Sequence, residues 1–194
     1  FSTRKKLGFD SNQLIFGSVG RLTAQKNQSF VLDVFHKIKL CHPNSVLLMI
    51  GEGAMRDELV KKAKFLGISD NVRWMENVVD MDSIYQGLDA LLFQSLYEGL
   101  PLTLVEAQAS GLACFVSDKI SEEALMTGRA LPLPINSGAD IWSNAIESVL
   151  GNPNYCVGRE KYAQIVADAG FDIRNTAADL TTIYDSQRKQ NMVS

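Results

Sequence analysis

The sequence is poor in the residues that bind metals or form disulfides. Its 194 residues include two histidines, His36 and His42, and three cysteines, Cys41, Cys114 and Cys156. Neither histidine belongs to a Cys, Asp or Glu cluster with the spacing of metal ligands. The odd number of cysteines and the lack of a C-x-x-C pair argue against a disulfide framework or a redox motif. We therefore expect structural histidines, free thiols in a reducing, cytoplasmic compartment, and no bound metal.

The sequence also lacks a basic excess and a long apolar run. Its net charge is −3, its pI is about 5.4, and its 19 Lys and Arg residues are scattered, so we expect no nucleic-acid partner. No apolar run approaches the roughly 18 residues of a membrane-spanning helix, and no charged-then-apolar leader opens the chain. The first residue is Phe1 rather than Met, which suggests a piece of a longer protein.

What is present is an ordinary globular composition, with 46% hydrophobic and 21% charged residues, which predicts one domain around one core. Apolar runs alternate with helical periodicity along the chain, a pattern typical of βα units. We therefore predict an α/β fold: a single Rossmann-like, doubly wound parallel sheet of about six strands with helices on both faces. The expected strands are 14–20, 45–51, 71–75, 89–95, 112–118 and, at an edge because of its prolines, 130–134.

Helices are expected between these strands and after the last one. Asn27 is predicted to cap the first, and Gly67 to end the second. Asp80 and Asp82 resemble the Asp-x-Asp site of another architecture of sugar-transferring enzymes, but they precede a short helix at 83–87. We expect Asp82 to cap that helix and Asp80 to favour its positive end. Further helices are expected at 101–111, 140–150 and 173–184.

The loop after the first strand carries two cations. Arg21 follows the strand directly, and Lys26 precedes the next helix. Ligands of open parallel sheets collect beyond the carboxyl ends of the strands. An Arg fork and a compact Lys charge at this place can clamp a diphosphate. The alternative is that both are solvated loop charges.

The loop after the fourth strand, in the stretch SLYEGLPLTLVEAQASG (95–111), is suited to an anion. Gly99 and Leu100 form a turn with Pro101, which fits the first turn of a helix, and Gly99 lets a ligand approach the backbone. The amides of Leu102 and Thr103 would then be free at the positive end of the helix dipole. We expect a phosphate to bind there.

Two glutamates flank this turn. Glu98 precedes it and can accept hydrogen bonds from hydroxyls of a group attached to the phosphate, whereas the two oxygens of Glu106 can take both hydroxyls of a ribose. The alternative is a helix N-terminal charge and an exposed helical position. We favour the functional interpretation, because Glu106 adjoins a predicted apolar stripe where a charge needs a partner. That stripe consists of Leu102, Val105, Ala109 and Leu112.

Glycine-rich loops elsewhere are weak signals. The Gly-Glu-Gly turn at 51–53 and the GSVGR loop at 17–21 both lack the G-x-G-x-x-G pattern. This argues against a nicotinamide cofactor.

Four stretches together resemble a known family. They are FGSVGRLTAQKN (16–27), MIGEGAMRDEL (49–59), LGISDNVRWM (66–75) and LLFQSLYEGLPLTLVEAQASGLACFVSD (91–118). In this order and spacing they resemble the donor-binding half of retaining, group 1 glycosyltransferases of the two-lobed GT-B fold, with bacterial capsule and exopolysaccharide enzymes closest. The Glu-x7-Glu spacing of Glu98 and Glu106 is that family's signature, and the resemblance spans about 10–185.

The resemblance implies a role for each site residue. Arg21 and Lys26 would hold the donor diphosphate together with the amides near Leu102 and Thr103. The two glutamates of the signature would contact the transferred sugar and the ribose, respectively. The loop after the third strand, near Val78, would lie by the base; here MENVV (75–79) replaces the more usual Phe-Leu-Gly.

The resemblance also implies an activity. The whole chain, 1–194, would be the donor domain of a metal-independent, retaining hexosyltransferase that needs no cofactor and uses a UDP-, GDP- or ADP-sugar. A saccharide or lipid-linked acceptor would bind an N-terminal lobe that is absent from this chain, so the isolated domain should transfer nothing. We also consider peripheral membrane association of the full protein.

Two alternatives stay open. A nucleotide-sugar epimerase lobe of the same fold should carry a catalytic His or acid pair, which we do not find. A non-catalytic binding module would have no reason to keep Arg21, Lys26, Glu98 and Glu106 together.

Overall fold

The computed structural model describes residues 3–152, 155 and 157–193. Within these residues six strands form one sheet in the order β3-β2-β1-β4-β5-β6, and every neighbouring pair is parallel. The single, doubly wound parallel sheet predicted from the sequence is confirmed. The strands are β1 (Ile15–Val19), β2 (Val46–Ile50), β3 (Val72–Met75), β4 (Ala90–Phe93), β5 (Ala113–Ser117) and β6 (Ala130–Leu133).

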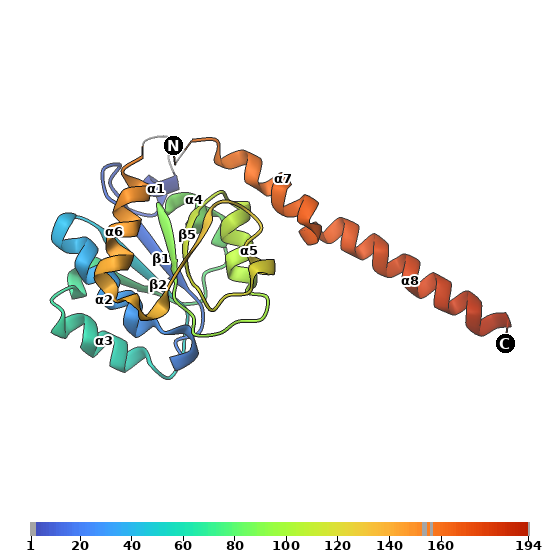
Figure 1. Ribbon diagram of the computed structural model, residues 1–194, viewed down its shortest axis with the longest axis horizontal. Coiled ribbons are helices and arrows are strands. Elements are labelled where there is room, and N and C mark those ends of the chain that lie inside the picture. Colours follow the sequence, from blue (N-terminus) through green and yellow to red (C-terminus); the bar gives the residue numbers. More distant parts are fainter. Residues whose placement is uncertain (1–2, 153–154, 156, 194) are drawn as a thin grey trace.

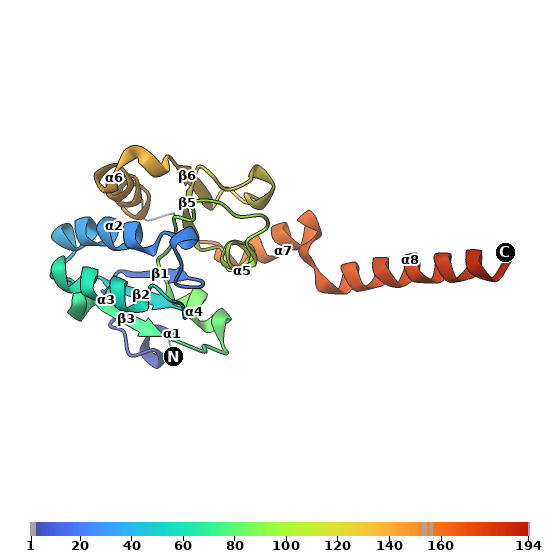
Figure 2. The same ribbon diagram turned by 90° about the horizontal axis from the view of Figure 1, so that it is seen from below.

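Helices cover both faces of the sheet (Figures 1 and 2). The helices α2 (Gln28–Cys41), α3 (Arg56–Phe65) and α6 (Ala139–Leu150) pack on one face. The helices α4 (Met81–Gly87) and α5 (Leu102–Ala109) pack on the other, with α7 (Tyr162–Val166) against α5. A short α1 (Thr3–Lys6) lies next to α4, and α8 (Ile173–Val193) extends away from the sheet (Figure 2).

The central strands are buried on both faces, which explains their continuous apolar runs. In β2, Leu47 and Met49 belong to the core under α2, α3 and α6. The alternate residues Val46, Leu48 and Ile50 belong to the core under α4 and α5, as the period of two in a strand requires. The predicted edge position of the proline-containing strand is confirmed, because β6 ends the sheet.

Two capping predictions were wrong in detail. Asn27 precedes α2, but its backbone is left-handed (φ 53°) and its side chain makes no capping hydrogen bond. The fourth helix begins two residues earlier than expected, at Met81, so Asp80 rather than Asp82 is its cap. The Ser83 N–H donates to Asp80 Oδ1 over 3.0 Å. Hydrogen bonds from the Ser83 hydroxyl and amide lower the pKa of Asp80.

The predicted stripe of α5 was also partly wrong. Leu102 is 64% exposed and Ala109 is half-buried. The buried positions include Gln108, which donates to the Ala124 carbonyl over 2.7 Å and accepts from the Thr127 N–H over 3.1 Å. A polar residue with buried hydrogen-bond partners takes a core position, so the apolar periodicity alone misplaced the stripe.

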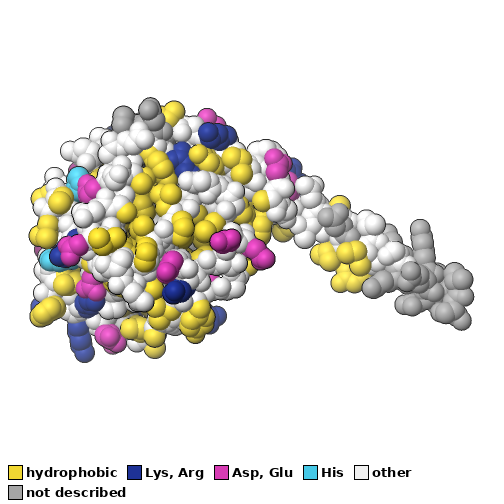
Figure 3. Space-filling model, in the orientation of Figure 1, with side chains coloured by type: hydrophobic (Ala, Val, Ile, Leu, Met, Phe, Trp, Pro, Cys, Tyr) yellow, Lys and Arg dark blue, Asp and Glu magenta, His cyan; other side chains and the backbone are white. Residues whose placement is uncertain are grey.

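The surface and the cysteines add three observations. Acidic and basic side chains are interspersed on the face shown in Figure 3. None of the described helices combines the length and apolar content that crossing a bilayer requires. Cys41 is exposed and Cys114 is buried, both as free thiols, and Cys156 lies outside the described residues.

Candidate functional site

The strand order reverses between β1 and β4, and the chain leaves these two neighbours for helices on opposite faces. This is the switch point at which open α/β sheets bind ligands. The two loops beyond it are joined directly. The Leu96 N–H donates to the Gln25 carbonyl over 2.8 Å, and Gln25 Nε2 donates to the Tyr97 carbonyl over 2.9 Å. Residues from the two predicted anion loops therefore lie together.

Lys26 and Glu98 meet across this junction. Lys26 Nζ lies 2.6 Å from Glu98 Oε1, and the two side chains are only 19% and 11% exposed. The contact is an ion pair without an aligned hydrogen bond. The ammonium also lies 5.1 Å from the centre of the Phe93 ring. Gly20 leaves room for this side chain, since a Cβ there would lie 3.2 Å from Lys26 Cε.

Arg21 is exposed, and its side chain has no hydrogen bond or ion pair with any residue that the structure describes. It lines a cavity of about 470 Å³ together with Gly51, Glu52, Gly53 and Asn77. Gln28 Nε2 donates to the Arg21 carbonyl over 2.8 Å, which fixes the loop backbone. The guanidinium is therefore available to an anion.

The Gly-Glu-Gly turn after β2 has a packing role. A Cβ on Gly51 would overlap the Gly20 carbonyl oxygen, and one on Gly53 would overlap the Leu22 carbonyl oxygen. Both glycines also have positive φ, 134° and 156°. The turn thus supports the Arg21 loop through close backbone approach.

The turn before α5 is open to a ligand. Gly99 and Leu100 are exposed, and a Cβ on Gly99 would meet nothing within 4 Å. Leu102 and Thr103 are the first two residues of α5, so their amides have no acceptor within the helix. Glu98 stands four positions before Leu102 and therefore belongs to the loop rather than to the helix.

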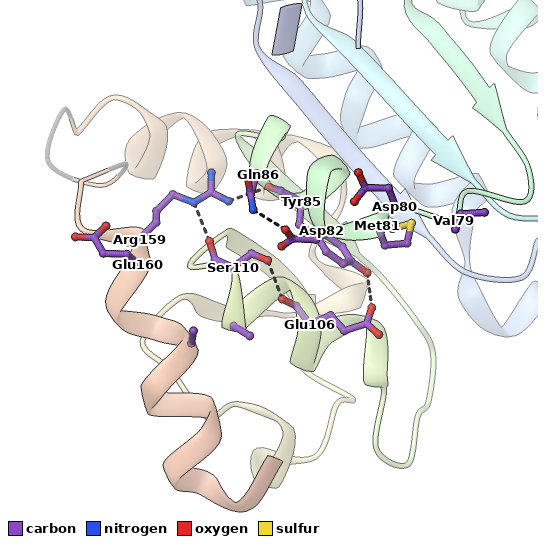
Figure 4. Close-up of a pocket in the computed structure, with 12 residues that line it drawn as sticks. Val79, Asp80, Met81, Asp82, Tyr85, Gln86, Glu106, Ser110, Arg159 and Glu160 are labelled. Carbon is purple, nitrogen blue, oxygen red and sulfur yellow. Dashed lines mark hydrogen bonds between the residues drawn. The ribbon is translucent and has the colours of Figure 1, made fainter. Parts of the chain in front are cut away.

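Glu106 lies on α5 about one turn beyond its start, and its contact is with α4. The Tyr85 hydroxyl donates to Glu106 Oε2 over 3.0 Å (Figure 4). Tyr85 is 2% exposed. Burial, and next the charge of Glu106, raise the pKa of Tyr85 above its ordinary value, so its hydroxyl is protonated and acts as the donor. Glu106 itself is exposed, and the expectation that it lies near the apolar side of the helix was wrong.

The Glu106 carboxylate lines a cavity of about 820 Å³ between α4, α5 and α7 (Figure 4). Tyr85 lines it beside the carboxylate, Asp80 and Asp82 line it at the start of α4, and Arg159 and Glu160 line it towards α7. This is a different cavity from the one that Arg21 lines.

The segment after β3 borders both cavities. Asn77 lines the cavity of Arg21, and Val79 lines the cavity of Glu106. Val78, between them, packs against the core under α4 and α5. The expectation that Arg21, Lys26, Glu98 and Glu106 surround one donor in one cavity was wrong. The structure pairs Lys26 with Glu98 and places Arg21 and Glu106 in two cavities that share this segment as a border.

Comparison with known proteins decides the family. The family model for glycosyl transferases group 1 matches residues 1–166. The chain belongs to this family.

Individual relatives agree with this assignment. The chain is 30% identical over 183 residues to EpsF of Bacillus subtilis (strain 168), which is named as a putative glycosyltransferase; the match covers 92% of this chain and 46% of EpsF. HepE of Anabaena, solved with UDP and glucose, superposes with a TM-score of 0.79 at 19% identity, over 94% of this chain and 51% of HepE. The chain spans about half or less of the curated relatives it matches.

A third match concerns a single domain. The C-terminal domain of a group 1 glycosyl transferase, LpcC of Francisella tularensis, superposes with a TM-score of 0.65 at 20% identity. The match covers 86% of this chain and 88% of that domain.

The sequence of this group 1 chain did not reveal three residues of the site. Tyr85 looks like a core aromatic, Asn77 like a loop residue, and Arg159 like a surface charge. Their positions depend on how α4, α5 and α7 pack, which no local pattern encodes. Among the described residues, no group of three His, Cys, Asp or Glu side chains is arranged to hold a metal.

Proposed function

We propose that this chain is the donor-binding domain of a metal-independent, retaining hexosyltransferase that uses a UDP-, GDP- or ADP-sugar. The observation that carries the proposal is the meeting of Lys26 and Glu98 at the switch point, beside the open first turn of α5. A cation and free amides at this place suit a diphosphate, and a carboxylate beside them suits sugar hydroxyls.

The charges fit the chemistry of sugar transfer. When the bond between the sugar and the phosphate breaks, negative charge develops on the departing diphosphate. Lys26, Arg21 and the amides of Leu102 and Thr103 would stabilise that charge, because fixed positive groups need no reorganisation during the reaction. These groups would supply the positive charge that a metal supplies in other enzymes.

The remaining proposed contacts are to the sugar, the ribose and the base of the donor. Glu98 would accept hydrogen bonds from the sugar, and Glu106 from the ribose. Val78 and its neighbours in the segment after β3 would lie by the base. Three structural neighbours were solved with UDP, one of them HepE with glucose as well, which supports a nucleotide-sugar donor.

The acceptor would bind outside this chain. We propose a saccharide or lipid-linked acceptor on a second, N-terminal lobe, a cytoplasmic location, and peripheral membrane association of the full protein. On this proposal the isolated chain binds nucleotide but transfers no sugar.

Replacement of Lys26 tests the proposal. In the full-length enzyme that contains this chain, Lys26→Ala should lower the turnover number about 10²-fold, by analogy with the loss of an oxyanion donor. Initial rates with UDP-, GDP- and ADP-sugars, with and without EDTA, measure this, and EDTA should leave the rate unchanged. Lys61→Ala, at an exposed position of α3, is the matched control. An unchanged rate in Lys26→Ala would refute the proposal.

A further inference from the structure

Tyr85 combines a core position with a polar contact at the cavity. Its ring packs in the core under α4 and α5, and it is 2% exposed. Its hydroxyl nevertheless reaches Glu106 Oε2, 3.0 Å away, at the border of the 820 Å³ cavity. A phenylalanine would fill the same core space, so packing alone does not require the hydroxyl.

The hydrogen bond fixes one oxygen of the carboxylate and leaves the other available. Glu106 Oε1 has no hydrogen bond with any residue in the described part of the chain. A free glutamate side chain loses rotamer freedom when it binds a ligand. A side chain that is already held loses less, which favours binding.

The backbone that carries Tyr85 is itself fixed. Arg159 Nη2 donates to the Tyr85 carbonyl over 2.8 Å, Nη1 to the Leu88 carbonyl over 3.1 Å, and Nε to the Ser110 carbonyl over 3.0 Å. These carbonyls lie at the ends of α4 and α5, so one guanidinium joins the helix of Tyr85 to the helix of Glu106 (Figure 4). The helices that carry the hydroxyl and the carboxylate are thereby joined at their C-terminal ends.

We propose that Tyr85 is a positioning residue, which holds the Glu106 carboxylate in the orientation that accepts the ribose hydroxyls of the donor nucleotide. This inference rests on the proposed function. It adds that the preference for ribose over deoxyribose depends on a hydroxyl that does not touch the nucleotide.

The test compares ribonucleotides with deoxyribonucleotides. Isothermal titration of the full-length enzyme with UDP, GDP and ADP identifies the nucleotide that binds. Its 2′,3′-dideoxy counterpart, which lacks both ribose hydroxyls, is titrated next as the deoxynucleotide. Tyr85→Phe should weaken the ribonucleotide roughly threefold to tenfold, the cost of ordering one side chain. It should leave the affinity for the deoxynucleotide within about twofold, and it should add no further loss in a Glu106→Ala background.

The ratio of the affinities for the ribonucleotide and the deoxynucleotide distinguishes a positioning role of Tyr85 from a general loss of stability. Reduced stability of Tyr85→Phe would weaken the binding of both nucleotides equally and leave the ratio of their affinities unchanged, and an unchanged ratio would overturn the inference. Tyr184→Phe, at an exposed position of α8, is the matched control.

Failure of the proposed function gives a different result. If none of the three ribonucleotides binds, or if Glu106→Ala keeps the full ribose preference, the ribose role of Glu106 fails and the inference fails with it. If Glu106→Ala loses the preference while Tyr85→Phe retains it, only the positioning role of Tyr85 is refuted.

Discussion

At the scale of single residues, the Glu98 carboxylate has two opposing effects, one on Lys26 and one on a donor that approaches it. The carboxylate neutralises the charge of the mostly buried ammonium. The same carboxylate repels a diphosphate that approaches the ammonium. On the proposed function, binding of a donor therefore requires Glu98 to turn from Lys26 towards another partner, such as a sugar hydroxyl.

Replacement of Glu98 should separate these effects. Glu98→Gln keeps the shape of the side chain and removes its charge, so we expect tighter binding of the free nucleoside diphosphate and slower sugar transfer in the full-length enzyme. Titration calorimetry and initial rates measure the two quantities. Weaker nucleotide binding in Glu98→Gln would show that the carboxylate does not compete for Lys26.

Gly53 offers a second test at this scale. Its φ is 156°, and an added Cβ would overlap the Leu22 carbonyl oxygen. Gly53→Ala should lower the free energy of unfolding by about 1–3 kcal/mol, the cost of a strained backbone position. Urea titration measures the change. Gly128→Ala, where an added Cβ meets nothing within 4 Å, should be close to neutral, and equal effects in both variants would contradict the prediction.

At the scale of elements, the strands were the most predictable part. β1, β2, β4 and β5 are buried on both faces and therefore leave uninterrupted apolar runs in the sequence. The start of α4 and the buried face of α5 were less predictable, since they depend on side-chain hydrogen bonds at Asp80 and Gln108. The contact between Tyr85 and Glu106 joins two helices across 21 positions of sequence, and only their packing creates it.

Arg159 donates hydrogen bonds to the C-terminal ends of both helices. Arg159→Ala removes a charged donor from three carbonyls at the ends of α4 and α5. We expect the free energy of unfolding to fall by about 2–3 kcal/mol. Arg159→Lys should recover little, because an ammonium lacks the planar fork.

Urea or thermal unfolding of these Arg159 variants measures the change in the free energy of unfolding. Arg174→Ala is the control, because the Arg174 side chain is 86% exposed and pairs with Asp172, only two positions away, so that its removal should have little effect. A stability equal to the wild type in Arg159→Ala would show that this guanidinium does not hold the two helices.

At the scale of the whole molecule, α8 stands apart from the core. It extends away from the sheet (Figures 1 and 2), and Ile173, Leu180, Ile183 and Tyr184 are exposed along it. Helical periodicity predicted a helix at 173–184, but not that its apolar side chains would lack a core to pack against. Periodicity reports an apolar face, and it does not report what covers that face.

Removal of residues 173–194 should therefore leave the stability of the rest of the chain unchanged. The midpoint of urea unfolding, followed by the fluorescence of Trp74 and Trp142, should equal that of the whole chain. The far-UV circular dichroism should lose helical signal. A clearly lower midpoint would show that α8 stabilises the sheet in solution.

The central position of β1 and β4 in the sheet affects how often their backbone hydrogen bonds open. Amide hydrogens in the middle of a sheet exchange with solvent only in large-scale opening, whereas edge strands such as β3 and β6 exchange through local fraying. The loops of Lys26 and Glu98 are attached to these slowly exchanging strands. Thermal fluctuations at the periphery can therefore occur without disturbing the groups that face the donor.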